Sequence, residues 1–123
     1  MDDEASVRKA VGATLQLLGH AVELAADGEE AIESFKKAKS RGNPFDAVML
    51  DLTVQGGLGG QETLRELLKV DPSVQAILMT GYSTDPVLLD PESHWFKGGL
   101  AKPFSHDQLQ KMISRLMDHR SAP

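Results

Sequence analysis

The sequence predicts an α/β fold, a doubly wound parallel sheet with helices on both faces. Strand-like apolar runs alternate along the chain with segments of helical periodicity, which is the pattern of strand–helix–strand units. Connections of this kind are right-handed and cover both faces of a parallel sheet. The 123 residues fit one domain, and 41% hydrophobic residues are enough for a buried core.

The first third of the chain predicts a helix, a short strand and a second helix. Residues 6–18 carry apolar side chains on one helical face, and Gly19 follows as a terminator. A short strand is expected over 21–25. Helical periodicity resumes over 29–39 and ends before Pro44.

The rest of the chain continues the alternation of strands and helices. The predicted elements are a strand over 45–51, a glycine-rich loop over 53–60, a helix over 61–69, a strand over 74–80, an irregular segment over 81–98 with a short helix at 87–89, a strand over 99–103, and a final helix opened by a capping box at 105–108. We take residues 1–118 as the domain and expect 119–123 to be a frayed tail. Trp95 and Phe96 are expected in the core.

Composition excludes several classes of function. The net charge is −5 and no basic run stands out, which argues against direct nucleic-acid binding. The absence of cysteine excludes disulfides, thiolate catalysis and cysteine-ligated zinc. No apolar stretch is long enough to span a bilayer, and the acidic start does not resemble a signal peptide. We therefore expect a cytoplasmic domain without membrane contact.

Polar residues end three of the predicted strands: Asp51, Thr80 and Lys102. The carboxyl ends of parallel strands share one edge of the sheet, so these side chains should converge on one pocket. The acidic cluster Asp2-Asp3-Glu4 at the start of the chain adds further carboxylates. Carboxylates, a hydroxyl and an ammonium together suit a divalent cation and a phosphoryl group.

Each of these residues also has a plainer explanation. Asp51 is a candidate nucleophile that accepts a phosphoryl group, or a strand-end residue that caps a turn. The acidic cluster is a candidate Mg²⁺ site, or an acidic terminus that favours the helix dipole. Thr80 and Lys102 are candidate phosphate ligands, or an ordinary strand threonine and an exposed lysine.

The joint pattern favours the functional interpretation. For each residue taken alone, the plain explanation is favoured over the functional one. The site can be dismissed only if all the plain explanations hold at once. The residues also occur in the order, and at the strand ends, that a shared pocket needs. The Lys102–Pro103 bond is a candidate cis peptide that would re-aim the lysine.

These residues lie in motifs that resemble the receiver domain of two-component response regulators. The motifs are Met1-Asp2-Asp3-Glu4, Val48-Met49-Leu50-Asp51-Leu52, Leu78-Met79-Thr80-Gly81 and Leu100-Ala101-Lys102-Pro103-Phe104. The resemblance covers nearly the whole chain, and the joint set is highly specific. It implies the flavodoxin-like receiver fold, whose sheet is five-stranded in the family.

The resemblance also implies a role for each residue. Asp51 would be the phosphoacceptor, and Thr80 and Lys102 would hold the phosphoryl oxygens. Asp3 would bind Mg²⁺ directly and Asp2 more loosely, through water, with the backbone carbonyl of Thr53 completing the site. The phosphoryl donor would be the phosphohistidine of a histidine kinase or phosphotransfer domain. The domain would also hydrolyse its own aspartyl-phosphate, without being an enzyme on other substrates.

The loop after Asp51, together with Gly81-Tyr82-Ser83, looks most like receivers at the C-terminus of hybrid sensor histidine kinases. We expect that context here, with a stand-alone regulator, or a receiver excised from a longer chain, as the alternatives.

The chain departs from the family pattern at two places. Family members have an apolar strand before the acidic pair, whereas only Met1 precedes Asp2. We expect the first strand to be missing or truncated, which predicts low stability, a homodimer or a domain-swapped association. The family's aromatic switch position is Gly99 here, so output is expected through the loop at 81–98.

Two other classes of function stay open from the sequence. One is a pseudo-receiver that keeps the fold as a binding module but is not phosphorylated. The other is a haloacid-dehalogenase-like phosphatase, whose motif needs a second aspartate where this chain has Thr53.

Overall fold

A three-layer arrangement of helix, sheet and helix surrounds a short parallel sheet. The structure is a computed structural model that describes residues 1–121, with side chains described through residue 118. Among these residues, β1 (Val48–Asp51), β2 (Ala76–Thr80) and β3 (Gly98–Ala101) pair in the order β1-β2-β3, all parallel. All five residues of β2 are buried, as expected for a central strand covered on both faces.

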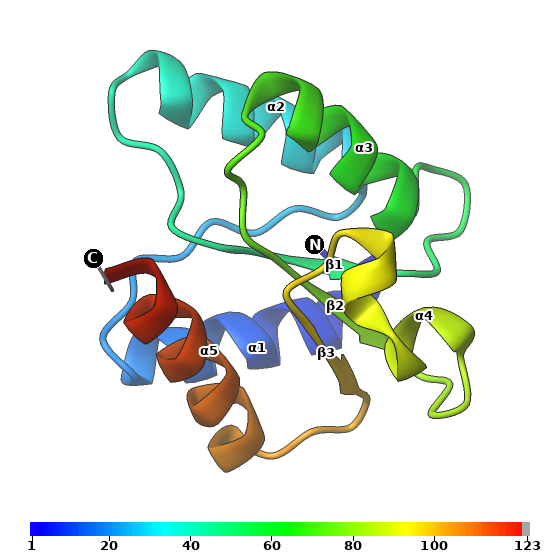
Figure 1. Ribbon diagram of the computed structural model, residues 1–123. Helices are drawn as coiled ribbons and strands as arrows, with labels where there is room; N and C mark the ends of the chain where they lie inside the picture. The colour runs from blue at the N-terminus through cyan, green and yellow to red at the C-terminus, as the bar shows by residue number, and fades with distance from the viewer. Residues whose placement is uncertain (122–123) are drawn as a thin grey trace.

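Helices cover both faces of this sheet (Figure 1). The helical elements are α1 (Ala5–Leu17), α2 (Gly28–Ser40), α3 (Gly60–Val70), α4 (Pro86–Leu89), the 3-10 turn η1 (Pro91–His94) and α5 (His106–Ser121). One apolar core contains Phe35 of α2 and Leu64 of α3 against Leu50 and Leu78 of the sheet. The other contains Leu109 and further residues of α5, with α1 packed beside them. The predicted α/β fold with helices on both faces is confirmed.

Local sequence signals account for two of the helix starts. The side chain of Asp27 accepts a hydrogen bond from the Glu30 amide at 2.9 Å and so caps α2. Before α5, the Gln108 amide donates to Ser105 Oγ at 3.0 Å, and the Ser105 amide donates to Gln108 Oε1 at 2.8 Å. This reciprocal pair is the capping box that the sequence predicts.

The strand register brings three chain segments to one sheet edge. Asp51 pairs with Met79, and Thr80 pairs with Ala101. The Lys102 amide donates to the Thr80 carbonyl at 2.7 Å. Asp51, Thr80 and Lys102 therefore lie together at the carboxyl edge of the sheet, where the sequence predicts them.

The strand predicted over 21–25 is not formed; the segment has no regular secondary structure. It is bonded to the start of the chain by one backbone hydrogen bond, from the Asp2 amide to the Ala25 carbonyl at 3.1 Å. A strand needs a partner along its length, and only the end of a partner, at Met1 and Asp2, lies beside this segment. The apolar pattern was therefore insufficient on its own.

Other boundaries also shift. The strand predicted over 45–51 begins only at Val48, and the helix predicted over 61–69 extends by one residue at each end. The backbone of α5 continues to Ser121, so the boundary predicted at residue 118 falls within this helix, and the last two residues of the predicted tail lie outside the described residues. No helix of the described chain combines the length and apolar character needed to cross a membrane.

The prediction for the aromatic pair is half right. Phe96 is buried in the core. The prediction that Trp95 is buried is wrong, because its side chain is 68% exposed. It ends η1 in the left-handed conformation, with φ of 66°. That turn directs neighbouring side chains differently from a strand or helix, so adjacency to a core phenylalanine did not predict burial.

Candidate functional site

Asp51 and Lys102 form the centre of the candidate site. Asp51 ends β1 and is only 3% exposed. The Lys102 side chain reaches back over the sheet edge, with Nζ 3.3 Å from Asp51 Oδ1 and 2.9 Å from Asp2 Oδ2. The Lys102–Pro103 peptide is cis, as the sequence suggested. A single ammonium therefore lies between two buried carboxylates.

The acidic pair is fixed in place by the backbone of Met1. The Asp51 amide donates to the Met1 carbonyl at 3.0 Å, and the Met1 ammonium donates to the Met49 carbonyl at 2.6 Å. These two bonds place Asp2 beside the end of β1. Asp2 is 1% exposed, and its Oδ1 accepts a bond from the Glu4 amide at 3.0 Å.

Asp3 lies nearer the solvent than Asp2 does. Its side chain accepts a hydrogen bond from the Gln55 amide at 3.1 Å, which ties the acidic pair to the loop after β1. Both Asp2 oxygens are already bonded, one to Lys102 and one to Glu4. Asp3 is therefore the more accessible of the two carboxylates.

Three carboxylates come close enough to share a cation. One oxygen from each of Asp2, Asp3 and Asp51 lies within 4.8 Å of the others. Mg²⁺ prefers oxygen ligands and is usually held by one or two carboxylates together with water. Asp3 and Asp51 face a cavity of about 640 Å³ that is also lined by Thr53 and Lys102. This donor set fits Mg²⁺, and the cavity has room for water and a small anion.

The electrostatics of the site record an excess of buried negative charge. The pKa of Asp51 is raised to about 6, first by burial and then by the Asp2 carboxylate, while Lys102 opposes both. Burial by itself lowers the pKa of Lys102, but the carboxylates of Asp2 and Asp51 outweigh it and the net shift is upward. Burial lowers the pKa of the Met1 ammonium to about 6. A bound cation would relieve the repulsion among the carboxylates.

Thr80 lies at the same sheet edge but below the cavity surface. It is 1% exposed, and its Oγ accepts a hydrogen bond from the Tyr82 amide at 3.1 Å. Because Tyr82 follows in the loop that lines the cavity, any shift of Thr80 would be transmitted to that loop.

The sequence interpretation assigned no role to two groups beside the site. The Met1 backbone anchors Asp2, and the Gln55 amide anchors Asp3. Both act through main-chain atoms, which leave no signal in residue type. The exposed ring of Tyr82 also lines the cavity, and its position two residues beyond Thr80 is the signal that points to it.

The space at Gly99 is filled by leucines from two elements. A Cβ at this position would lie 2.8 Å from Leu88 Cδ1 and 2.9 Å from Leu78 Cγ. Leu88 belongs to α4, which packs against β2 and β3. A side chain at residue 99 would therefore displace the side chains of Leu88 and Leu78.

The family model for the response regulator receiver domain matches residues 1–114. The chain belongs to this family. A transcriptional regulatory protein, ZraR of Klebsiella oxytoca, is 31% identical over 119 residues, which are 97% of this chain and 26% of that protein. The sensor kinase CckA of Brucella abortus is 32% identical over 118 residues, which are 96% of this chain and 12% of that protein.

A solved structure shows the same fold. The receiver domain of the sensor histidine kinase PA1611 from Pseudomonas aeruginosa, with a magnesium ion coordinated in its active-site cleft, superposes with a TM-score of 0.82 at 25% identity. The match covers 96% of this receiver domain and 93% of that chain. The chain spans about a quarter or less of the curated relatives named above, which include both a transcriptional regulator and a sensor kinase.

Proposed function

We propose that this receiver domain accepts a phosphoryl group on Asp51, with Mg²⁺ bound beside it, in a two-component phosphorelay. The observation that carries the proposal is the grouping of Asp51, Lys102 and the acidic pair around one cavity. Asp51 is the carboxylate of this group that ends a strand and opens into the cavity.

The reaction is an in-line transfer between two residues. An oxygen of the Asp51 carboxylate attacks phosphorus, the P–N bond of a donor phosphohistidine breaks, and the imidazole leaves with the bonding electron pair and takes up a proton. Asp51 then carries an acyl phosphate, which water hydrolyses back to carboxylate and inorganic phosphate. Lys102 neutralises charge on the transferring phosphoryl oxygens.

Mg²⁺ would be held by Asp3 and Asp51 directly, by Asp2 through water, and by the backbone carbonyl of Thr53. Bound there, the ion supplies positive charge that stabilises the transferring phosphoryl group. Both carboxylate oxygens of Asp2 already accept hydrogen bonds, one from the Glu4 amide and one from Lys102, which supports binding of the ion by Asp2 through water. The raised pKa of Asp51 supports a need for a cation beside it.

The response to phosphate would run from Thr80 to the loop that follows it. The Thr80 hydroxyl would turn toward a phosphoryl oxygen, which breaks its bond from the Tyr82 amide and shifts the loop and α4. The tight packing of Leu88 over Gly99 couples α4 to β3 and supports this route over an aromatic switch.

The donor would be the phosphohistidine of a histidine kinase or of a phosphotransfer domain, in the cytoplasm. We infer that the domain is the receiver part of a hybrid sensor histidine kinase. The likeness to the receiver of sensor kinase PA1611 and to CckA supports this context. The likeness to ZraR is the argument for a transcriptional regulator instead.

Intact mass after incubation with acetyl phosphate tests the proposal. We expect one added phosphate with Mg²⁺ and none with EDTA, and Asp51→Asn should abolish it. Asp107→Asn is the matched control, because it removes the same charge from an exposed surface pair with Lys111. Absence of phosphate on a folded protein would instead support a receiver fold used only for binding.

A further inference from the structure

The loop between β1 and α3, residues 52–59, is closed at its base. A Cβ at Gly59 would lie 2.6 Å from the Leu52 carbonyl oxygen, and a Cβ at Gly60 would lie 2.8 Å from that of Asp51. The end of the loop and the start of α3 therefore pack directly on the carbonyls at its beginning, which the absence of side chains permits. The residues between these ends are held by other parts of the chain.

One of these contacts lies beside the candidate site. The Gln55 amide donates a hydrogen bond to Asp3 Oδ2 at 3.1 Å. Thr53 and Gln55 both line the cavity that Asp3 and Asp51 also line. Along the chain, Thr53 lies between the base of the loop and this bond, so its position depends on how the rest of the loop is held.

The second contact is with the first turn of α2. The Leu58 carbonyl accepts a hydrogen bond from the Gly28 amide at 3.2 Å, and the Leu58 amide donates to Glu29 Oε2 at 3.4 Å. The first bond satisfies an amide that has no partner within its own helix. Both backbone groups of Leu58 are therefore held by two successive residues of α2.

The loop backbone packs closely on this turn. A Cβ at Gly57 would lie 3.2 Å from Glu29 Oε2 and 3.3 Å from Asp27 Cβ. A Cβ at Gly28 would lie 2.6 Å from Leu58 Cβ. The glycines at 28 and 57 therefore let two lengths of backbone meet, and the Glu29 carboxylate bonds the loop where they do.

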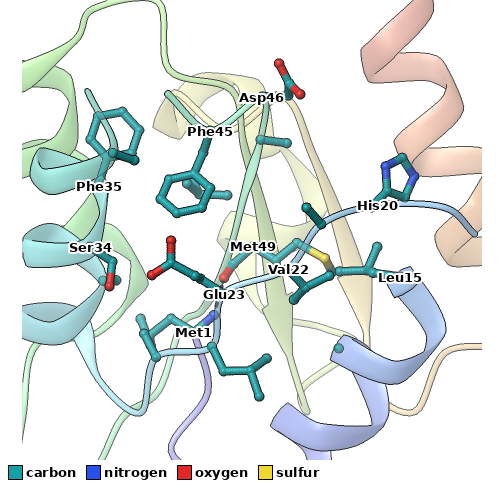
Figure 2. A pocket seen from close by; sticks show the side chains of 18 of the residues that line it. Met1, Leu15, His20, Val22, Glu23, Ser34, Phe35, Phe45, Asp46 and Met49 are labelled. Carbon is teal, nitrogen blue, oxygen red and sulfur yellow. Dashed lines mark hydrogen bonds between the residues drawn. The ribbon is translucent and has the colours of Figure 1, made fainter. Parts of the chain in front are cut away.

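The later turns of α2 face a different part of the molecule. Figure 2 shows Ser34 and Phe35 of this helix at a groove of about 390 Å³, with Met1 beside them. The described residues of α2 that line this groove begin at Ala31. A change of side chain at Glu29 therefore acts on the loop and not on the groove beside Met1.

We propose that Glu29 is a positioning residue for the cation site: by holding Leu58 it keeps the loop closed, with Thr53 at the cavity. This inference rests on the proposed Mg²⁺ site, in which the Thr53 carbonyl is one ligand. Without the Glu29 acceptor the middle of the loop is freed, and binding of the ion must then also order Thr53 and its neighbours. Coupling of this kind is reciprocal, so bound Mg²⁺ should in turn protect the Leu58 amide.

Mg²⁺ titrations by calorimetry compare the unmodified protein with Glu29→Ala, Glu29→Gln and Glu30→Ala. We expect the dissociation constant to rise about fivefold in Glu29→Ala, which is the effect of losing one hydrogen bond. Glutamine keeps an acceptor oxygen, so Glu29→Gln should stay within about twofold of the unmodified protein. Glu30→Ala is the matched control, because Glu30 is an exposed residue of the same charge in the same helical turn.

A second measurement follows the loop without metal. In EDTA, exchange of the Leu58 amide with water, measured by NMR, should be about fivefold faster in Glu29→Ala than in the unmodified protein. The Glu30 amide, which donates to Asp27, should be unchanged and reports that α2 stays capped. Addition of Mg²⁺ should slow exchange at Leu58 in the unmodified protein.

Three results would overturn this proposal alone. The first is exchange at Leu58 that does not change in Glu29→Ala. The second is faster exchange at Leu58 with an unchanged affinity for Mg²⁺, because the loop would then not be coupled to the ion. The third is an equal loss of affinity in Glu29→Gln or Glu30→Ala, which would assign the effect to charge. Absence of Mg²⁺ binding in the unmodified protein would instead contradict the proposed function on which the inference rests.

Discussion

Lys102 donates a hydrogen bond to Oδ2 of Asp2, 100 residues away in sequence, at 2.9 Å. This contact joins the loop after β3 to the start of the chain, and the same ammonium lies 3.3 Å from Asp51. The side chains of both aspartates are almost fully buried. The Lys102 ammonium therefore forms ion pairs with both carboxylates.

Replacement of Lys102 by methionine should destabilise the fold. Removal of one partner from a buried ion pair leaves uncompensated charge and costs about 3–5 kcal/mol of the free energy of unfolding. Urea denaturation at pH 8 measures this. The matched control is Lys69→Met, because Lys69 pairs with Glu66 on the exposed surface and such pairs contribute at most about 1 kcal/mol. Equal losses in the two variants would contradict the buried role of Lys102.

Replacement of Asp51 by asparagine should stabilise the metal-free protein above pH 6. The pKa of Asp51 is about 6 in the folded state against 3.8 in the unfolded chain. Between these values the folded state binds more protons, so the stability of the unmodified protein falls as pH rises from about 4 to 6, and the loss persists above. Asparagine does not titrate, so the variant avoids this loss. The difference between the two pKa values corresponds to about 1–3 kcal/mol of the free energy of unfolding.

The measurement for that prediction is the free energy of unfolding at pH 4 and pH 8 in EDTA. Asp51→Asn should exceed the unmodified protein at pH 8 and converge with it at pH 4. Asp107→Asn, on the exposed face of α5, should follow the unmodified protein at both values. A greater stability of Asp51→Asn at pH 4 that disappears at pH 8 would contradict the raised pKa of Asp51.

Magnesium should raise the thermal midpoint, because the proposed ion site is formed only when folding brings Asp2, Asp3 and Asp51 together. A ligand that binds only the folded state adds about 2.7 kcal/mol to the free energy of unfolding when its concentration is 100 times its dissociation constant. Asp3→Asn should reduce the shift at a fixed Mg²⁺ concentration, and Asp107→Asn should retain it. EDTA should reverse the effect. A shift of the same size in Asp3→Asn would remove this residue from the metal site.

Gly28→Ala should destabilise the protein by about 1–3 kcal/mol through overpacking. A Cβ at Gly28 would lie 2.6 Å from Leu58 Cβ and 2.9 Å from the Leu58 carbonyl oxygen, and it would also clash with Thr63 Oγ1. Thr63 cannot yield easily, because its hydroxyl donates to the Gly59 carbonyl at 2.7 Å. Gly81→Ala is the control, since no described residue beyond its two chain neighbours lies within 4 Å of its added Cβ. Thermal melts that place the two variants together would contradict the packing argument.

Sequence patterns predicted the positions of the site residues better than they predicted which segments form the edge strands of the sheet. Asp51 and Thr80 end their strands and Lys102 directly follows its strand, and the topology of a parallel sheet brings these strand ends together. Segment 21–25 has the apolar pattern of a strand but remains irregular, because a strand needs backbone partners that local sequence does not encode.

The depth of each site residue was also beyond the sequence. Thr80 and Lys102 looked equivalent as strand-end residues, yet Thr80 is buried away from the cavity and Lys102 lines it. The anchors of Asp2 and Asp3 are main-chain groups of Met1 and Gln55, which any residue type could supply. Trp95 was misjudged because its left-handed turn depends on η1 as a whole.

The central claim is that Asp51 accepts the phosphoryl group, and chemical mapping of the acceptor tests it most directly. The protein is incubated with acetyl phosphate and Mg²⁺, then reduced with borohydride, which converts an aspartyl-phosphate to homoserine. Tandem mass spectrometry then reads the modified position. The account predicts homoserine at residue 51, dependent on Mg²⁺ and absent without acetyl phosphate. Homoserine at another aspartate, or none at all in a folded protein, would contradict it.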